Sequence, residues 1–128
     1  MYARRMRALS IRQPWAELIL RGKKRIEVRK RRTKIRGVVF VYASATVAER
    51  ELEGCARYRI KMQRLKKGVL VGKVEIVDCR PLRKSDARAA CLTRVRPKLW
   101  AWILKRPKRA KRTRAPKRQP QPVFFNPF

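Results

Sequence analysis

The chain contains no histidine and only three cysteines, and both scarcities restrict its chemistry. Without histidine there is no histidine general base and no serine–histidine or cysteine–histidine nucleophile pair. Cys55, Cys79 and Cys91 are widely spaced and form no Cys-x-x-Cys pair. Zinc sites of the Cys₄ or Cys₂His₂ type are therefore excluded, and we expect a protein that uses neither a metal ion nor a cofactor.

Long hydrophobic runs are also missing. Runs such as GVVFVYASA are far shorter than a membrane span. The first residues, MYARRMRALSIRQPW, lack the apolar stretch of a signal peptide. We therefore expect no membrane association and a cytoplasmic location, where the cysteines remain free thiols.

Acidic residues are scarce, whereas basic residues are abundant. The chain has 38 Lys and Arg against 8 Asp and Glu, a formal net charge of +30. Such a charge in a small chain repels itself unless a polyanion lies beside it. Clustered basic residues are typical of nucleic-acid-binding proteins, so RNA or DNA is favoured over an anionic membrane surface or an unusually soluble surface.

The hydrophobic pattern predicts one domain built from short strands and a few helices. A chain of 128 residues, 45% of them hydrophobic, can bury a single modest core. A helix is expected in RQPWAELILRG, with Pro14 in its first turn and Gly22 at its end. Further helices are expected at about 47–60 and 86–92. The segments that predict strands are 7–11, 25–29, 37–44, 68–82 and 98–105.

Residues 105–118 form a basic segment in which nine of fourteen positions are Lys or Arg. A charge run of this kind is usually a solvated arm. However, residues 119–128 contain three phenylalanines and predict an aromatic end that docks back onto the domain. We therefore expect the basic segment to be an anchored loop or ribbon.

The stretch LSIRQPWAELILRGKKRIEVR resembles the start of an ASCH domain, a relative of the PUA fold. The family pattern Gly-x-Lys-x-x-Glu-x-Arg is met by Gly22, Lys24, Glu27 and Arg29, with SIRQPWA at the right distance upstream. The resemblance continues through VLVGKVEIVDC and LWAWIL to VFFNPF, so it covers nearly all of a single domain, 1–128. It implies an α+β fold, a PUA-like small mixed β-barrel of five to six strands flanked by two to three helices. A cleft is implied around the first helix and the Gly-x-Lys-x-x-Glu-x-Arg segment.

The resemblance also implies RNA binding, with SIRQP lining the cleft. The free N–H groups at the start of the following helix can accept an anion. For Trp15, core packing is the favoured alternative, because it shares a helix face with Leu18 and Ile19. The nucleic-acid-binding candidates are Arg12, Gln13, Trp15, Lys24, Arg29 and Ser44 in the cleft, and Lys105, Arg106, Lys108, Arg109, Lys111 and Arg112 in the basic segment.

Some ASCH relatives are amidohydrolases of acylated cytidine nucleosides, and others are reported ribonucleases. The amidohydrolase set is a lysine, a threonine three residues later and a glutamate on a later strand. Lys24 and Glu75 match the lysine and that glutamate, but Glu27 occupies the threonine position, which counts against the same nucleophilic chemistry. If the protein is an enzyme, it is a hydrolase whose catalytic candidates are Lys24, Glu27 and Glu75.

Structural roles compete with these catalytic ones. Glu27 can orient Arg25 and Arg29 on the same strand face through bidentate hydrogen bonds. Glu75 can pair with Lys73 or with an arginine on a neighbouring strand. Ion-pair networks and active sites use the same residues. For Glu27 the organising role is favoured over the catalytic one, whereas for Glu75 the sequence favours neither.

The preferred hypothesis is a non-catalytic RNA-binding protein with a basic cleft and a basic C-terminal segment on the phosphate backbone. Its candidate partners are tRNA, ribosomal RNA or another structured RNA. The alternative is a ribonuclease or acylcytidine amidohydrolase. The charge of +30 favours an RNA partner, because a nucleoside hydrolase has no need of it.

Overall fold

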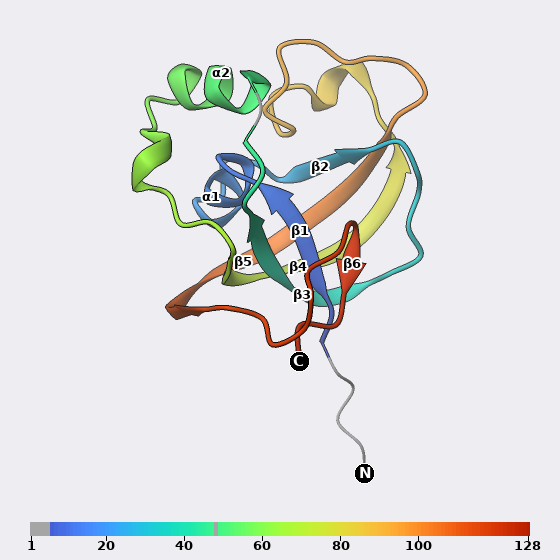
Figure 1. Ribbon diagram of the computed structural model, residues 1–128. Coiled ribbons are helices and arrows are strands. Elements are labelled where there is room, and N and C mark those ends of the chain that lie inside the picture. The colour runs from blue at the N-terminus through green and yellow to red at the C-terminus, as the bar shows by residue number, and fades with distance from the viewer. Residues whose placement is uncertain (1–5, 48) are drawn as a thin grey trace.

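The computed structural model describes residues 6–47 and 49–128, and its main feature is a curled sheet of six strands (Figure 1). The strand order is β2-β5-β4-β3-β1-β6, in which β1 and β3 are parallel and all other neighbours are antiparallel. This architecture confirms the predicted α+β class. The strands are β1 (Ala8–Arg12), β2 (Ile26–Arg29), β3 (Gly37–Ser44), β4 (Val69–Pro81), β5 (Trp100–Arg114) and β6 (Phe124–Phe125).

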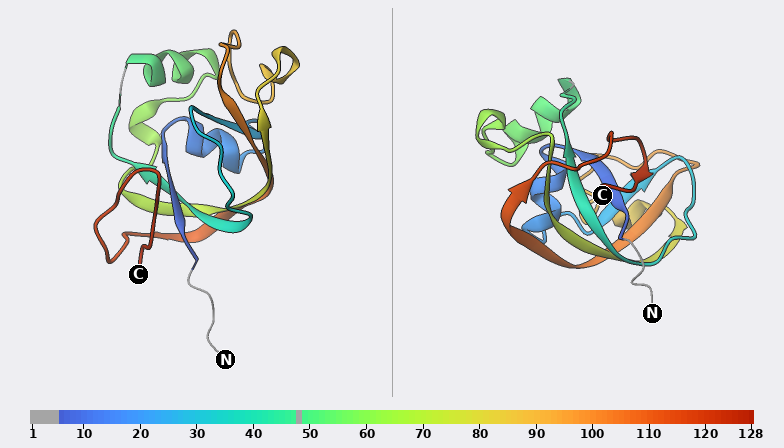
Figure 2. Two further views of the ribbon diagram at one scale, coloured as in Figure 1. Left: turned by 90° about the vertical axis from the view of Figure 1, so that its right-hand side faces the viewer. Right: turned by 60° about the horizontal axis from the view of Figure 1, so that its bottom comes forward.

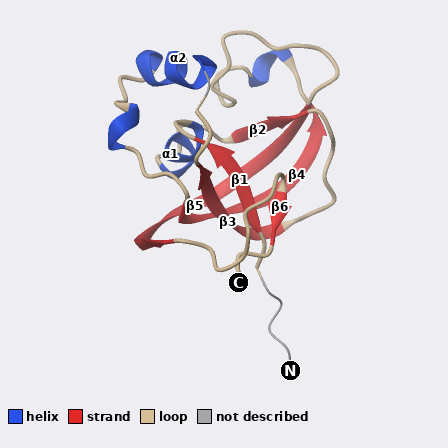
Figure 3. Cartoon of the chain, in the orientation of Figure 1, coloured by secondary structure: helices blue, strands red, loops and turns tan. Residues whose placement is uncertain are grey.

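Over residues 6–47 and 49–128, two α-helices and two 3₁₀ turns accompany the sheet. They are α1 (Trp15–Leu20), α2 (Glu49–Arg57), η1 (Met62–Arg64) and η2 (Lys84–Asp86). Figure 3 shows α1, α2 and η1 gathered at one side of the molecule, with η2 apart from them. Within the described part of the chain, none of the helices has the length and apolar character needed to cross a membrane.

Helix α1 lies on the concave side of the sheet, where β4 and β5 curve round it (Figure 2). Its residues Ala16 and Ile19 are buried in one cluster with Val41, Val74 and Leu104. Burial of apolar side chains is the main favourable term in folding. This cluster therefore fixes α1 against strands β3, β4 and β5, and with it the segment that follows α1.

Strand β5 is longer than the predicted strand 98–105, because residues 105–114 continue it, in the manner of the ribbon and not of the loop that were both expected for the basic segment. Their backbone pairs with β4, in a register that places Arg109 opposite Gly72 and Arg114 opposite Leu70. A Cβ at Gly72 would collide with the carbonyl oxygen of Lys108 and with Leu20. Glycine at this position thus permits the close approach of the two strands beside α1.

The predicted helix at 86–92 is wrong: a single 3₁₀ turn, η2, is followed by irregular turns. Asp86 explains part of the difference, because its carboxylate accepts hydrogen bonds from the Arg83 N–H and from the Arg80 guanidinium at 2.7–2.8 Å. The Ala89 carbonyl oxygen accepts from the N–H groups of Arg25 and Ile26. It therefore binds the start of β2 instead of closing a helical turn.

The C-terminal segment runs beside β1, where β6 pairs with it (Figure 1). Its aromatic residues pack on rings of the sheet. The ring pairs are Phe124–Trp102, Phe125–Tyr42 and Phe128–Phe40, with centroid separations of 5.6, 5.3 and 5.9 Å. The N–H groups of Lys117 and Arg118 also donate to the Pro127 carbonyl. The end of the basic segment is thus tied to the aromatic end.

Replacing Asp86 with Asn tests the Arg80–Asp86 pair. Hydrogen bonds from Arg80 outweigh burial and lower the pKa of Asp86 from 3.8 to about 2. A depressed folded-state pKa means that the carboxylate stabilises the fold above its unfolded pKa, and that this contribution is lost as the pH falls through about 2. We expect Asp86→Asn to lower the free energy of unfolding by roughly 1–3 kcal/mol at neutral pH, with the difference shrinking below pH 4.

Urea unfolding followed by circular dichroism at several pH values measures this difference. Asp78→Asn is the matched control, because Asp78 is exposed and its pair with Arg36 is long, at 3.9 Å. That control is expected to change stability by less than about 0.5 kcal/mol. Equal effects of the two substitutions would show that lost negative charge, and not the pair, is responsible.

Candidate functional site

The turn after α1 brings the Gly-x-Lys-x-x-Glu-x-Arg segment back beneath the helix. Gly22 has a φ of +77°, a conformation that favours glycine at the end of a helix. The N–H groups of Lys23 and Lys24 both donate to the Leu18 carbonyl, at 3.0 and 3.1 Å. The chain reverses here, and β2 then pairs with the first residues of β5.

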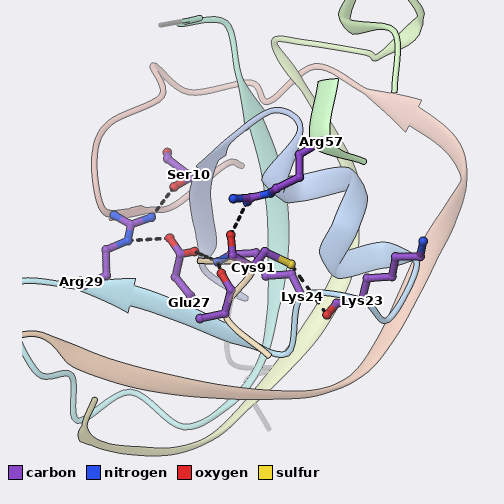
Figure 4. Close-up of polar contacts among 8 residues, drawn as sticks. Ser10, Lys23, Lys24, Glu27, Arg29, Arg57 and Cys91 are labelled. Carbon is purple, nitrogen blue, oxygen red and sulfur yellow. Dashed lines mark hydrogen bonds and ion pairs between the residues drawn. The ribbon is translucent and has the colours of Figure 1, made fainter. Parts of the chain in front are cut away.

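Lys24 is buried in this turn, with 6% of its surface exposed. Its Nζ donates to the Ala90 carbonyl oxygen at 2.7 Å and lies 3.8 Å from Glu27 Oε1 (Figure 4). The ammonium is also 5.6 Å from the ring centroid of Trp15. Burial lowers the pKa of Lys24, although the Glu27 carboxylate acts in the opposite direction. The structure thus places a partly compensated buried cation at the centre of the segment.

Glu27 joins Lys24 to Arg29. Its Oε2 accepts a hydrogen bond from Arg29 Nε at 2.7 Å, and Arg29 Nη2 donates to the Ser10 carbonyl at 2.9 Å (Figure 4). The guanidinium of Arg29 also lies 5.6 Å from the Trp102 ring centroid. Lys24, Glu27 and Arg29, here called the buried ion cluster, therefore link β2 to β1 and β5.

Trp15 has two cations near its ring, Lys24 and Arg57. Arg57, in the last turn of α2, places its guanidinium 6.0 Å from the Trp15 centroid and donates to the Cys91 carbonyl (Figure 4). Gly54 lies against the same ring, because a Cβ there would be 2.5 Å from Trp15 Cη2. Glycine has a low helix propensity and weakens α2. It is nevertheless required at position 54, because a larger side chain would collide with the Trp15 ring.

Glu75 lies away from the buried ion cluster. On β4 it falls between the core residues Val74 and Ile76, so its side chain points to the opposite, outer face. There its Oε1 accepts from Arg106 Nε at 2.8 Å, and this hydrogen bond lowers the pKa of Glu75. Of the three catalytic candidates, the structure therefore brings Lys24 and Glu27 together but places Glu75 elsewhere. Glu75 instead has the alternative role, that of a cross-strand partner of an arginine.

The SIRQP segment is used largely for internal contacts. Gln13 is buried, and its side chain donates to the Lys66 carbonyl and accepts from the Glu17 N–H at the start of α1. The expected anion position at that helix start is therefore taken in part by Gln13. Arg12 pairs with Glu51 at 3.0 Å and lies opposite Ser44 in the β1–β3 ladder.

The basic candidates of β5 are all exposed, but they do not share one set of neighbours. Lys105 and Arg106 line a groove of about 310 Å³ together with Lys24 and Arg25. Arg109 forms a two-point ion pair with Glu17 of α1, with both N–O distances at 2.8 Å. The other members, Lys108, Lys111 and Arg112, are exposed.

Sequence reasoning missed Glu17 and Arg57. Burial raises the pKa of Glu17, but hydrogen bonds from Arg109 and Arg21 outweigh it and leave the pKa below its ordinary value. The four-residue spacing of Glu17 and Arg21 signals one of these pairs, whereas nothing in the sequence indicates the pair with Arg109. Arg57 has no local signal, because its contacts come from distant segments.

Among the described residues, no group of three or more histidine, cysteine, aspartate or glutamate side chains is placed to hold a metal ion. Chemically, the buried ion cluster can position Trp15 and Arg29 and can hold a proton on Lys24.

The ASCH domain family model matches residues 9–116. The chain belongs to the ASCH domain family. Its fold is similar to the crystal structure of ASCH from Zymomonas mobilis, with a TM-score of 0.66 and 16% identity over 96% of this chain and 87% of that one. A single-substitution mutant of the same protein gives a TM-score of 0.63 and 13% identity, over 95% of this ASCH domain and 89% of the mutant chain. No curated protein sequence matches this ASCH domain.

These likenesses confirm the small α+β, PUA-like fold inferred from the sequence. ASCH domains are commonly RNA-binding. In this ASCH domain, the Gly-x-Lys-x-x-Glu-x-Arg pattern corresponds to the turn, the buried lysine and the ion pair described above.

The contact between Gly54 and Trp15 can be tested by a double-mutant cycle. Gly→Ala in a helix normally stabilises a protein by roughly 0.5–1 kcal/mol. We expect Gly54→Ala to destabilise this ASCH domain instead, because the new methyl group displaces the Trp15 ring. In a Trp15→Leu background the same substitution is expected to be neutral or stabilising. Urea unfolding measures all four proteins, and stabilisation by Gly54→Ala in the Trp15 background would contradict the contact.

Proposed function

We propose that this ASCH domain is a non-catalytic, cytoplasmic RNA-binding protein. Its long basic strand contacts the phosphate backbone of a structured RNA, such as tRNA or ribosomal RNA. The surface around Trp15 and Arg29, positioned by the buried ion cluster, contacts the same RNA. The proposal rests on the way in which the structure distributes its charges.

The carboxylates are used within the fold. In the part of the chain that the structure describes, six of them each form an ion pair with an arginine: Glu17, Glu27, Glu51, Glu75, Asp78 and Asp86. The remaining cations far outnumber these pairs, since the chain has 38 Lys and Arg. An excess of this size on the surface favours a polyanionic partner.

Strand β5 gives the excess charge a defined direction. Residues 105–114 are extended and largely exposed, and at about 3.3 Å per residue they span roughly 30 Å. One strand of a regular duplex carries roughly nine phosphates over that length, at about 3.4 Å each. A row of cations on a fixed strand can therefore contact several phosphates at once.

A hydrolase is the second candidate, and the burial and lowered pKa of Lys24 favour it. The contacts of Lys24 weigh against it. Lys24 is 6% exposed, and its Nζ donates to the Ala90 carbonyl and lies beside the Glu27 carboxylate. A general base must reach the proton that it abstracts. Binding is therefore the function that these contacts support best.

Replacing three exposed lysines of β5 tests the backbone contact. We expect Lys105→Gln/Lys108→Gln/Lys111→Gln to reduce the slope of log K against log salt by about 2, because each lost phosphate contact removes about 0.7 for a single strand. Fluorescence anisotropy with a labelled RNA between about 50 and 200 mM salt measures the slope.

The matched control is Lys30→Gln/Arg32→Gln/Lys34→Gln, which removes the same charge from the exposed β2–β3 loop. It is expected to change the slope by less than half as much. Similar slopes for the two triple variants would contradict a specific role for β5. Absence of RNA binding by the wild type would overturn the proposed function itself.

A cleavage assay separates the binding and hydrolase candidates. Total RNA and an N⁴-acylated cytidine are incubated with the wild type and with Lys24→Met, which retains the buried side-chain volume but not the ammonium. We expect intact RNA and intact nucleoside with both proteins. Products that form with the wild type and vanish with Lys24→Met would establish the hydrolase instead.

A further inference from the structure

A second, wider groove lies between η1 and the far half of β5. Its volume is about 610 Å³, within the range of roughly 300–1,000 Å³ that is usual for ligand sites. One wall consists of residues 64–66 and the other of residues 109–113, with Gln13, Glu17 and Val71 also lining it. None of the residues of the Gly-x-Lys-x-x-Glu-x-Arg pattern lines this groove.

The walls carry five cationic side chains and a single acidic one. The cations are Arg64, Lys66, Arg109, Lys111 and Arg112, and the acid is Glu17, which is already paired with Arg109 and Arg21. The basic residues at 64 and 66 come from a different part of the chain than β5, so the groove presents positive charge from two sides. An anion that enters it is therefore contacted across the groove and not only along one strand.

Buried polar contacts hold the two walls in place. Gln13 Nε2 donates to the Lys66 carbonyl at 3.0 Å, and Gln13 Oε1 accepts from the Glu17 N–H at 2.9 Å. The Glu17 carboxylate then holds Arg109 through two contacts of 2.8 Å. This chain of contacts runs from one wall through α1 to the other. Because the walls are held before a ligand binds, little ordering entropy is lost on binding.

The lining of the groove indicates which part of a nucleic acid it accepts. Its uncharged lining residues include no aromatic ring on which a base can stack; they are Gln13, Leu65, Val71, Ala110 and Thr113. Cationic side chains and a hydroxyl group are suited to phosphate and sugar oxygens, which carry no sequence information. Lys66 Nζ already lies 3.3 Å from Thr113 Oγ1, so the two walls approach each other at this point.

We propose that the groove between residues 64–66 and 109–113 is a sequence-independent site for the sugar–phosphate backbone of RNA. This inference rests on the proposed function and adds to it a two-sided phosphate site, in which Arg64 and Lys66 act opposite the basic strand. Neither residue belongs to the basic C-terminal segment, so their role is separable from that of β5.

The test removes the two cations of the η1 side in the full chain. Arg64→Gln/Lys66→Gln is compared with Arg32→Gln/Lys34→Gln, which has the same residue types, spacing and charge in the exposed β2–β3 loop. We expect the first variant to lower the salt slope by about 1.4 and to weaken RNA binding about tenfold near 0.15 M salt. The loss should be equal for RNAs of different sequence, because only the backbone is contacted.

Thermal melting of both variants verifies the fold, and both are expected to melt like the wild type because all four side chains are exposed. If the two variants lose equal affinity, the groove inference is overturned while RNA binding by the protein stands. A loss of affinity for only one RNA sequence would also overturn the groove inference, since such a loss would indicate that bases are read. If the wild type binds anionic vesicles and no RNA, both this inference and the proposed function fail.

Discussion

The pairing of scarce carboxylates with arginine is the interaction on which the rest of the structure depends. A chain of net charge +30 repels itself, and each carboxylate offsets this repulsion most where it joins two elements. Glu17 joins α1 to β5, Glu51 joins α2 to β1, and Asp86 joins η2 to β4. Removing one partner of such a pair leaves a charge uncompensated, so these few acids add specific links between elements that the apolar core holds together.

The same pairing leaves the outer surface unbalanced. A carboxylate that pairs with an arginine between two elements is not available to the other cations at the surface. Many of these cations lie on β5 and beside η1. The fold and the proposed function are therefore two results of one charge distribution. If an ASCH domain placed its carboxylates among the surface cations, its surface charges would repel one another less in the free protein. Such a surface would also attract a polyanion less strongly.

The strands that alternate or are rich in β-branched residues could be predicted from the sequence, because burial of one face sets their pattern. Segment 37–44 coincides with β3. The far half of β5 could not be predicted as a strand, since its residues are charged and exposed. It is extended because β4 supplies hydrogen-bond partners for its backbone. The site was predictable to a similar degree: the Gly22 turn and the Glu27–Arg29 pair are local, and strand alternation alone turns Glu75 away from Val74 and Ile76. By contrast, the pairing of Glu75 with Arg106 and the contact between Arg109 and Glu17 depend on how distant segments meet.

The C-terminal aromatic end connects the basic strand to the buried ion cluster. Phe124 stacks on Trp102, whose other contacts include Arg29 of the cluster. Phe128 lies 4.1 Å from the guanidinium of Arg114, the last residue of β5. Strand β5 is therefore held along its length by β4 and at its end by these rings. The backbone that carries these cations need not be ordered when RNA binds, so more of their attraction for phosphate remains as affinity.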